Sequence, residues 1–246
     1  MSLPAALLLV LAGAFPASAA SAPSTDPPLV AAVKKGDLNG LQALLASGSA
    51  VGAKDQYGWT AVMWAAGHGS GPMVSALLAA GANAAPSDAP GFNAMIEAAK
   101  GDRAGVVAAL AAHGFSCAAT DGLGVPALSY ATAKVSTGTA AALLACKADV
   151  NARDSHGFTP LMRAVQNGNP GAVAFLLANG ARADSRDNRG YTALMWAAHD
   201  GAAGSAKALL AANANPSIKG RDGRSAYSIA KARGQASIEA LLPATP

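Results

Sequence analysis

The sequence predicts an all-α repeat solenoid, in which short helix-turn-helix units stack in a line. The string Gly-x-Thr-x-x-x-x-Ala recurs at multiples of 33 residues, starting at Gly58, Gly157 and Gly190. An aspartate precedes each glycine by three residues, and two more divergent copies start at Asp88 and Asp121. A fixed period of this length, filled by alanine-rich helical pairs, is typical of stacked-repeat proteins.

The composition agrees with a single domain built from thin helical layers. The 246 residues are 52% hydrophobic and 5% aromatic, so the core must consist mainly of alanine, leucine and valine. The net charge is +4, and no basic run is longer than Lys34-Lys35. Binding of nucleic acid requires clustered basic residues, so this pattern favours no nucleic-acid partner.

The first 28 residues differ from the rest. An apolar run, Leu3 to Phe15, is followed by Ala17-Ser18-Ala19, a pattern of small residues at which signal peptidase cuts. We interpret 1–19 as a signal peptide and 20–28 as a linker, although no Lys or Arg precedes the apolar run; the alternative is a buried N-terminal helix. We expect an exported protein, periplasmic in a bacterium, with no membrane insertion after cleavage.

Residues 154–186 show how one unit folds. Asp154 and Gly157 are typical of a turn, and Thr159 followed by Pro160 is typical of a helix start. Apolar residues then follow at helical spacing, at Leu161, Ala164 and Val165. A second helix is expected between the Asn169-Pro170 pair and Gly180, with Gly168 separating the two helices.

These residues resemble the ankyrin-repeat pattern, Asp-x-x-Gly-x-Thr-Pro-Leu-x-x-Ala followed by Val-x-x-Leu-Leu-x-x-Gly-Ala. The resemblance implies helix-turn-helix units joined by β-hairpin fingers. We expect the following units: an N-terminal capping repeat at 29–54, full repeats at 55–87, 88–120, 121–153, 154–186 and 187–219, and a C-terminal capping repeat at 220–243.

The repeat at 121–153 departs from the pattern. Pro126 occupies the position of the capping threonine, and Lys147 occupies that of the glycine that ends the second helix. Asn213 replaces the same glycine in a later repeat, but asparagine tolerates the left-handed conformation and lysine does not. We therefore predict that 121–153 is the least stable repeat.

The residue after each turn glycine forms a column that is mostly aromatic: Trp59, Phe92, Val125, Phe158 and Tyr191. Its rings either contact a partner or pack finger against finger. The resemblance implies that the fingers and the exposed ends of the first helices form a partner-binding groove. The predicted partner-binding residues are Gln56, Tyr57, Trp59, His68, Phe92, Lys100, Lys134, His156, Phe158, Asn167, Arg189, Tyr191 and His199.

Other conspicuous residues have structural interpretations. Family position places Trp64 and Trp196 in the core. The turn aspartates recur every 33 residues, so they cannot share one metal ion, and we expect them to cap turns. The four histidines have no partners at ligand spacing, and no nucleotide or hydrolase motif occurs. We expect no metal, no cofactor and no catalytic residue.

Cys117 and Cys146 are the two cysteines. Adjacent stacking can bring them together, and an oxidising compartment permits a disulfide; the alternative is a pair of small buried thiols.

We expect a monomeric, non-catalytic binding module for an unidentified protein partner. The alternatives are a self-associating spacer and, least favoured, an enzyme whose candidates are His68, Lys100, His199 and Asp200.

Overall fold

The computed structural model describes residues 26–85, 88, 90–134 and 137–243. The predicted signal peptide at 1–19 and most of the predicted linker lie outside the described residues. The described helices follow one another in pairs: α1 (Pro28–Lys35) with α2 (Leu38–Ala46), α3 (Ala61–His68) with α4 (Gly71–Ala79), α5 (Ala94–Lys100) with α6 (Ala104–Ala112), α7 (Ala127–Ala131) with α8 (Gly138–Ala145), α9 (Pro160–Gln166) with α10 (Pro170–Ala178), α11 (Ala193–Asp200) with α12 (Ala203–Ala211), and α13 (Ala226–Ala232) with α14 (Ala236–Glu239).

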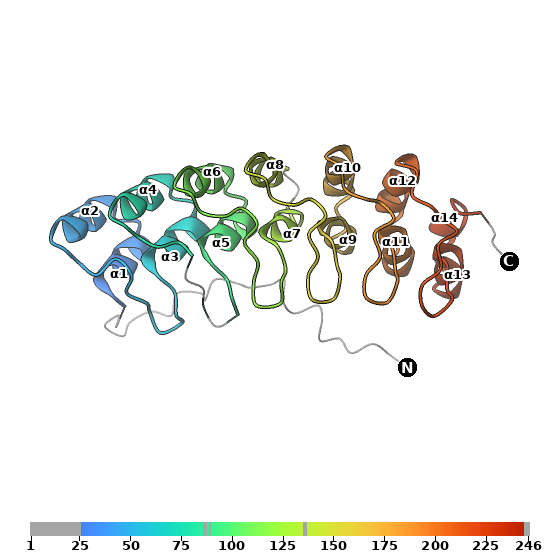
Figure 1. The fold of residues 1–246 in the computed structure, drawn as a ribbon, viewed down its shortest axis with the longest axis horizontal. Coiled ribbons are helices and arrows are strands. Elements are labelled where there is room, and N and C mark those ends of the chain that lie inside the picture. Colours follow the sequence, from blue (N-terminus) through green and yellow to red (C-terminus); the bar gives the residue numbers. More distant parts are fainter. Residues whose placement is uncertain (1–25, 86–87, 89, 135–136, 244–246) are drawn as a thin grey trace.

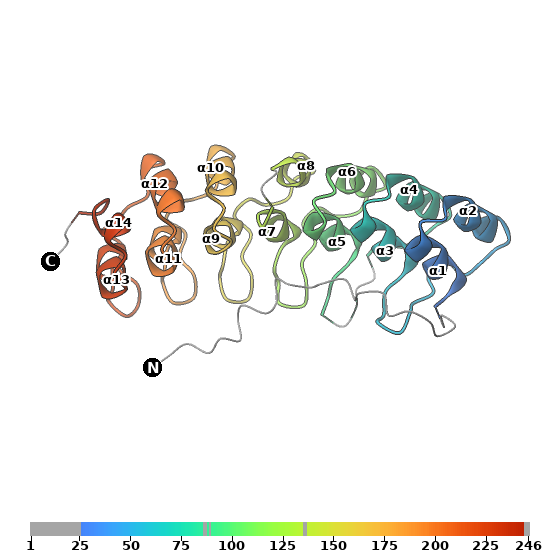
Figure 2. The ribbon, with the colours of Figure 1, turned by 180° about the vertical axis from the view of Figure 1, so that it is seen from behind.

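The pairs stack side by side into an elongated, gently curved slab (Figure 1). The odd-numbered helices form one row and the even-numbered helices form the other, and the same order is seen from behind (Figure 2). Loops project as fingers from the row of odd-numbered helices (Figure 1). The predicted all-α solenoid is therefore confirmed.

Among the described residues, the fingers contain no β-strands, only isolated β-bridges. The backbone pairs as isolated antiparallel bridges at the bases of three of them: Lys54 with Thr60, Thr120 with Pro126, and Lys219 with Ser225. No strand longer than such a bridge is found among the described residues. The fingers are thus tight turns whose shape depends on side-chain hydrogen bonds.

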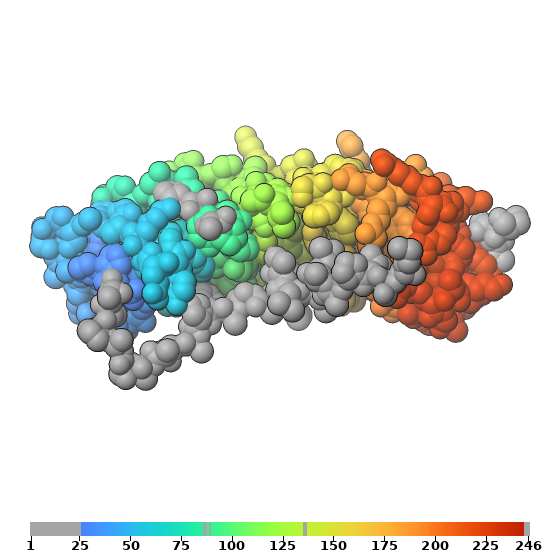
Figure 3. Space-filling view, turned by 90° about the horizontal axis from the view of Figure 1, so that it is seen from below, coloured from blue at the N-terminus to red at the C-terminus, as the bar shows by residue number. Residues whose placement is uncertain are grey.

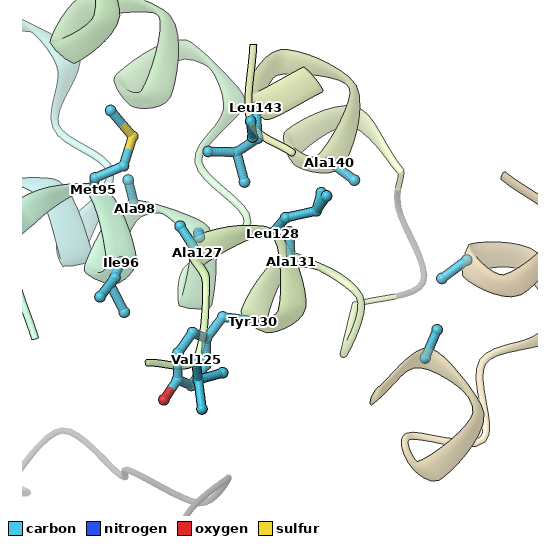
Figure 4. Close-up of a cluster of buried hydrophobic side chains, with 14 of the residues drawn as sticks. Met95, Ile96, Ala98, Val125, Ala127, Leu128, Tyr130, Ala131, Ala140 and Leu143 are labelled. Atoms are coloured by element: carbon cyan, nitrogen blue, oxygen red, sulfur yellow. The ribbon is translucent and has the colours of Figure 1, made fainter. Parts of the chain in front are cut away.

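The core runs through the whole stack between the two rows of helices. Figure 4 shows it around the third full repeat, where Met95 and Ile96 of α5, Leu128 of α7 and Leu143 of α8 are all buried. Alanines such as Ala98 lie between these larger side chains and let the helices approach closely. Because each pair buries its apolar face only against its neighbours, the stack is stabilised by adjacency.

Helix boundaries follow the expected signals. The side chains of Thr159 and Asn169 accept hydrogen bonds from backbone amides at the starts of α9 and α10. Lys147 and Asn213 both adopt positive φ, at 68° and 60°, in the position that glycine takes elsewhere. Asp102, in the turn between α5 and α6, also has a positive φ, at 56°, and this was not predicted from the sequence.

Among the described residues, no helix is long and apolar enough to pass through a bilayer.

Candidate partner-binding surface

An aspartate closes the turn of each full-repeat finger. In the finger at 154–158, one carboxylate oxygen of Asp154 accepts hydrogen bonds from the backbone amides of His156 and Phe158, both at 2.9 Å. The equivalent oxygens accept the same pair of bonds at Asp55, Asp121 and Asp187. These hydrogen bonds show that the aspartates cap the turns, as predicted from the sequence.

The second oxygen of the aspartate binds a donor on the following inner helix, nine residues further on. These donors are the side chains of Trp64 at 2.9 Å, Tyr130 at 2.6 Å, Arg163 at 2.5 Å and Trp196 at 3.0 Å. Trp64 and Trp196 are accordingly buried, at 5% and 6% exposure, as expected for core positions. Each such bond fixes a finger to the helix that follows it.

The second full repeat breaks this rule. Glu97 occupies the donor position, and a carboxylate cannot donate to Asp88 when both are ionised. Asp88 instead accepts a hydrogen bond of 2.8 Å from the indole nitrogen of Trp59, which belongs to the preceding finger. This bond joins two neighbouring fingers directly.

Glu97 is 1% exposed and pairs with Lys100 at 2.8 Å. Burial raises the pKa of the Glu97 carboxyl above its ordinary value, and the negative charge of Asp88 adds to this, although Lys100 acts in the opposite direction. Ionised Glu97 is thus in an unfavourable environment.

The aromatic column lies beneath the fingers. Val125, Phe158 and Tyr191 are 8%, 5% and 4% exposed, while Trp59 and Phe92 are half-buried. The rings pack on inner-helix rings: Phe158 on Trp196 at 5.0 Å and Trp59 on Trp64 at 4.7 Å between centroids. For Phe158 and Tyr191 the burial agrees better with packing inside the protein than with partner contact, although both rings pack on Trp196 of an inner helix and not finger against finger. Their role as partner contacts stays a prediction.

Basic side chains cover this aromatic layer. Lys34 lies over Trp64 at 4.4 Å, Lys100 over Phe92 at 4.2 Å, Arg163 over Phe158 at 4.7 Å and Arg224 over Tyr191 at 5.8 Å. Cations over ring faces are attracted by the ring quadrupole. The surface at the base of the fingers is therefore made of cations resting on rings.

The predicted residues at the inner-helix ends differ in their contacts. Asn167 donates to Thr132 at 3.2 Å, so its amide helps to join two repeats. His199 binds both Asp200 and Arg233. Lys134 and His68 are both classed as exposed. The imidazole of His68 is nevertheless partly removed from water, and this desolvation, together with the positive charges of Arg103 and Lys34, lowers its pKa.

An exposed residue stands two positions after each turn aspartate. We call this set the fingertip ridge: Tyr57, Pro90, Leu123, His156 and Arg189. Tyr57 and Leu123 are 51% and 49% exposed, and among the described residues they are the two exposed large hydrophobic side chains. Tyr57, His156 and Arg189 are among the residues predicted from the sequence, whereas Leu123 is not. Its position two residues after Asp121 would have identified it.

A second set of finger residues gathers positive charge. Arg153, Arg186, Lys219 and Arg221 line a recess of about 320 Å³ between the last fingers. Arg153, Arg186 and Lys219 recur at the 33-residue period, one position before the turn aspartate or its equivalent, Gly220. Because these residues are 33 positions apart, they form no basic run in the sequence, and the cluster exists only in the stacked repeats.

Cys117 and Cys146 are joined by a disulfide, with their Cα atoms 6.0 Å apart. The bridge links the loop before the third full repeat to the end of α8 within it.

The sequence and the fold agree with one family. A model of ankyrin repeats matches residues 29–121, 128–220 and 165–244. The chain belongs to the ankyrin-repeat family, whose domains are in general protein-binding modules.

Among solved structures, the ankyrin repeat domain of Bcl-3, described as a unique member of the IkappaB protein family, is similar. It shares 26% identity at a TM-score of 0.77, over 87% of this chain and 98% of that one. The human ASB11 ankyrin repeat domain has the same fold, with 23% identity, a TM-score of 0.79, and coverage of 90% and 100%. Comparison with curated proteins gave no significant match.

Proposed function

We propose that this protein is a non-catalytic interaction module that holds a protein partner on its fingertip ridge and on the adjoining ends of the inner helices. The exposure of Tyr57 and Leu123, while the other large apolar side chains of the fingers are buried or half-buried, carries this proposal. Exposed apolar residues on a rigid, charged scaffold are typical of interface anchors.

The polar residues that an enzyme would need have other roles. His199 is held between Asp200 and Arg233, and Lys100 is paired with Glu97 and rests on Phe92. These contacts favour a structural role for His199, Asp200 and Lys100, which are candidates for catalytic residues if the protein is an enzyme. The self-associating spacer is tested by light scattering, where a monomer at high concentration excludes it.

We further propose that the protein works outside the cytoplasm, in the cell envelope. Two features support this: the signal-peptide pattern at 1–19 and the Cys117–Cys146 bridge, since disulfides persist in oxidising compartments. Alkylation of cells before lysis, followed by thiol titration of the unfolded protein, tests it. Two free thiols would exclude an oxidising compartment.

Site-specific photo-crosslinking tests the ridge. A benzophenone side chain is placed at Tyr57 or Leu123, and as controls at Ala108 or Ala141, which are exposed on the outer helices α6 and α8. We expect a discrete protein adduct from the ridge positions alone, and we expect Tyr57→Ala with Leu123→Ala to abolish co-purification of that protein. Adducts that are absent, or identical at ridge and control positions, would contradict the ridge assignment.

A further inference from the structure

We propose that the last fingers form a docking site for an extended, acidic segment of a protein partner. The site consists of Arg153, Arg186, Lys219 and Arg221, and we call it the basic finger edge. This inference rests on the proposed function and specifies the chemistry of the partner that it requires.

The charge of the molecule is unevenly distributed along the stack. Residues 1–148 contain seven basic and seven acidic residues, so the whole net charge of +4 comes from residues 149–246. Net charge that gathers in one part of a surface raises the local concentration of oppositely charged partners. The end of the stack that contains α9 to α14 is therefore the end that attracts acidic groups.

Within this half, the recess of about 320 Å³ concentrates the charge. Arg153, Arg186, Lys219 and Arg221 line it, and Asp187 is the one carboxylate among its lining residues. Asp187 is 4% exposed, and its two oxygens already accept bonds from Arg189, Tyr191 and Trp196. The four basic side chains form no ion pair with any described carboxylate. The recess thus presents four cations that are not paired with the carboxylates of the described residues.

Contacts with the scaffold position two of these cations. The guanidinium of Arg186 donates to the backbone carbonyl of Lys219 at 2.7 Å, which spans two fingers. The guanidinium of Arg153 lies so close to Gly157 that a Cβ on that glycine would be 2.6 Å from it. Cations that are already positioned lose less side-chain entropy when they bind an anion.

The spacing of the cations matches an extended chain. Arg153, Arg186 and Lys219 belong to successive fingers, and packed helices are separated by about 8–10 Å. An extended peptide advances about 3.3 Å per residue, so a carboxylate at every third residue meets successive fingers. The repeats follow one another in one line from one end of the molecule to the other (Figure 3), so the fingers that carry these three cations are neighbours along one direction.

The same features argue for a protein segment and against single-stranded nucleic acid. Binding of single strands combines phosphate contacts with exposed aromatic rings on which bases stack. No aromatic residue lines the recess, and Phe158 and Tyr191 of these fingers are buried. The basic finger edge offers charge at regular intervals without a stacking surface.

Fluorescence anisotropy with the purified protein tests the site. The probe is a labelled peptide of repeated Glu-Ser-Gly units, and the comparison peptide has the same composition with its glutamates contiguous. We expect tighter binding of the spaced peptide and weakening of that binding as salt is raised. We expect Arg153→Gln, Arg186→Gln and Lys219→Gln together to weaken it about tenfold, which corresponds to about 1.4 kcal/mol.

A charge-matched variant separates the site from general attraction. Lys35→Gln, Arg182→Gln and Lys207→Gln remove the same charge from exposed residues elsewhere, and circular dichroism verifies that both variants are folded. Equal losses in the two variants, equal affinity for the two peptides, or tighter binding of a poly-dT oligonucleotide would each overturn the proposal. Ridge crosslinks without peptide binding would refute this site alone, whereas peptide binding without ridge crosslinks would refute the ridge as the partner surface.

Discussion

The indole nitrogen of Trp59 donates a hydrogen bond of 2.8 Å to the carboxylate of Asp88 in the next finger. In the full repeats that start at Asp55, Asp121, Asp154 and Asp187, the corresponding carboxylate oxygen takes a donor from its own repeat. Asp88 closes its own turn through the amide of Phe92, at 2.8 Å. Its second oxygen, however, takes its donor from the neighbouring finger, because Glu97 stands where a donor is needed.

Trp59→Phe removes this donor while keeping most of the ring. The partner is charged and the site is half-buried, so we expect a loss of about 1–2 kcal/mol in the free energy of unfolding. Tyr191→Phe is the matched control, because it removes a similar bond of 2.7 Å to the exposed Asp222, which Arg224 also binds. Urea denaturation measures both, and an equal or larger loss in the control would contradict the special role of Trp59.

Glu97→Gln is expected to change the pH dependence of stability. Burial raises the pKa of Glu97 in the folded protein, and Asp88 adds to this, whereas the charge of Lys100 opposes it. The stability that comes from keeping Glu97 protonated in the folded protein is therefore fully present below the unfolded pKa of about 4.3. That contribution is lost as the pH rises through the folded pKa. Glutamine resembles the neutral form, so the Tm of the variant relative to the native chain should increase from pH 4 to pH 7. A difference that stays constant or falls over this range would show that Lys100 fully compensates the buried charge.

Lys147 is a site where a single substitution should stabilise the protein. Its φ of 68° is costly for a side chain with a Cβ, so Lys147→Gly should raise the free energy of unfolding by up to ~1 kcal/mol. Asn213→Gly, at a φ of 60°, should give a smaller gain because asparagine tolerates this conformation. Thermal denaturation compares the two, and a larger gain at Asn213 would exclude conformational strain as the explanation.

The 33-residue period was sufficient to predict the fold, because each unit repeats the same local signals. The turn aspartates, the Thr159 cap and the helix-ending glycines all act within a few residues, where sequence spacing is also spatial spacing. The stack then follows from the need of each pair to cover its apolar face.

The site was harder to predict, since it depends on contacts between repeats. The sequence placed Phe158 and Tyr191 in a column, but it did not show that Phe158 packs on Trp196 of the next repeat, with 5.0 Å between the ring centroids. Three residues of the basic finger edge, Arg153, Arg186 and Lys219, are likewise 33 positions apart, so no contiguous run of basic residues marks this edge in the sequence. Both features become visible when the repeats are aligned. Leu123 then falls at the same repeat position as Tyr57, and Arg153, Arg186 and Lys219 fall together at another.

The third full repeat provides the last prediction, because weak local signals and a covalent bridge meet there. Its inner helix α7 spans five residues, begins after Pro126 without a side-chain cap, and is followed by an outer helix that ends before the strained Lys147. The Cys117–Cys146 bridge closes a sequence separation of 29 residues around this repeat. For a loop of that size, the chain-entropy model gives a stabilisation of about 3–4 kcal/mol.

Hydrogen exchange measures this balance locally. With the bridge intact, we expect amides in 129–144 to exchange faster than those in 161–177, and equal or slower exchange would contradict the weakness of this repeat. After reduction, or in the Cys117→Ala with Cys146→Ala variant, protection should fall most in 129–144, because a solenoid opens where its nearest-neighbour contacts are weakest. A uniform loss along the whole stack would mean that the repeats unfold as one cooperative unit and that the bridge stabilises them all equally.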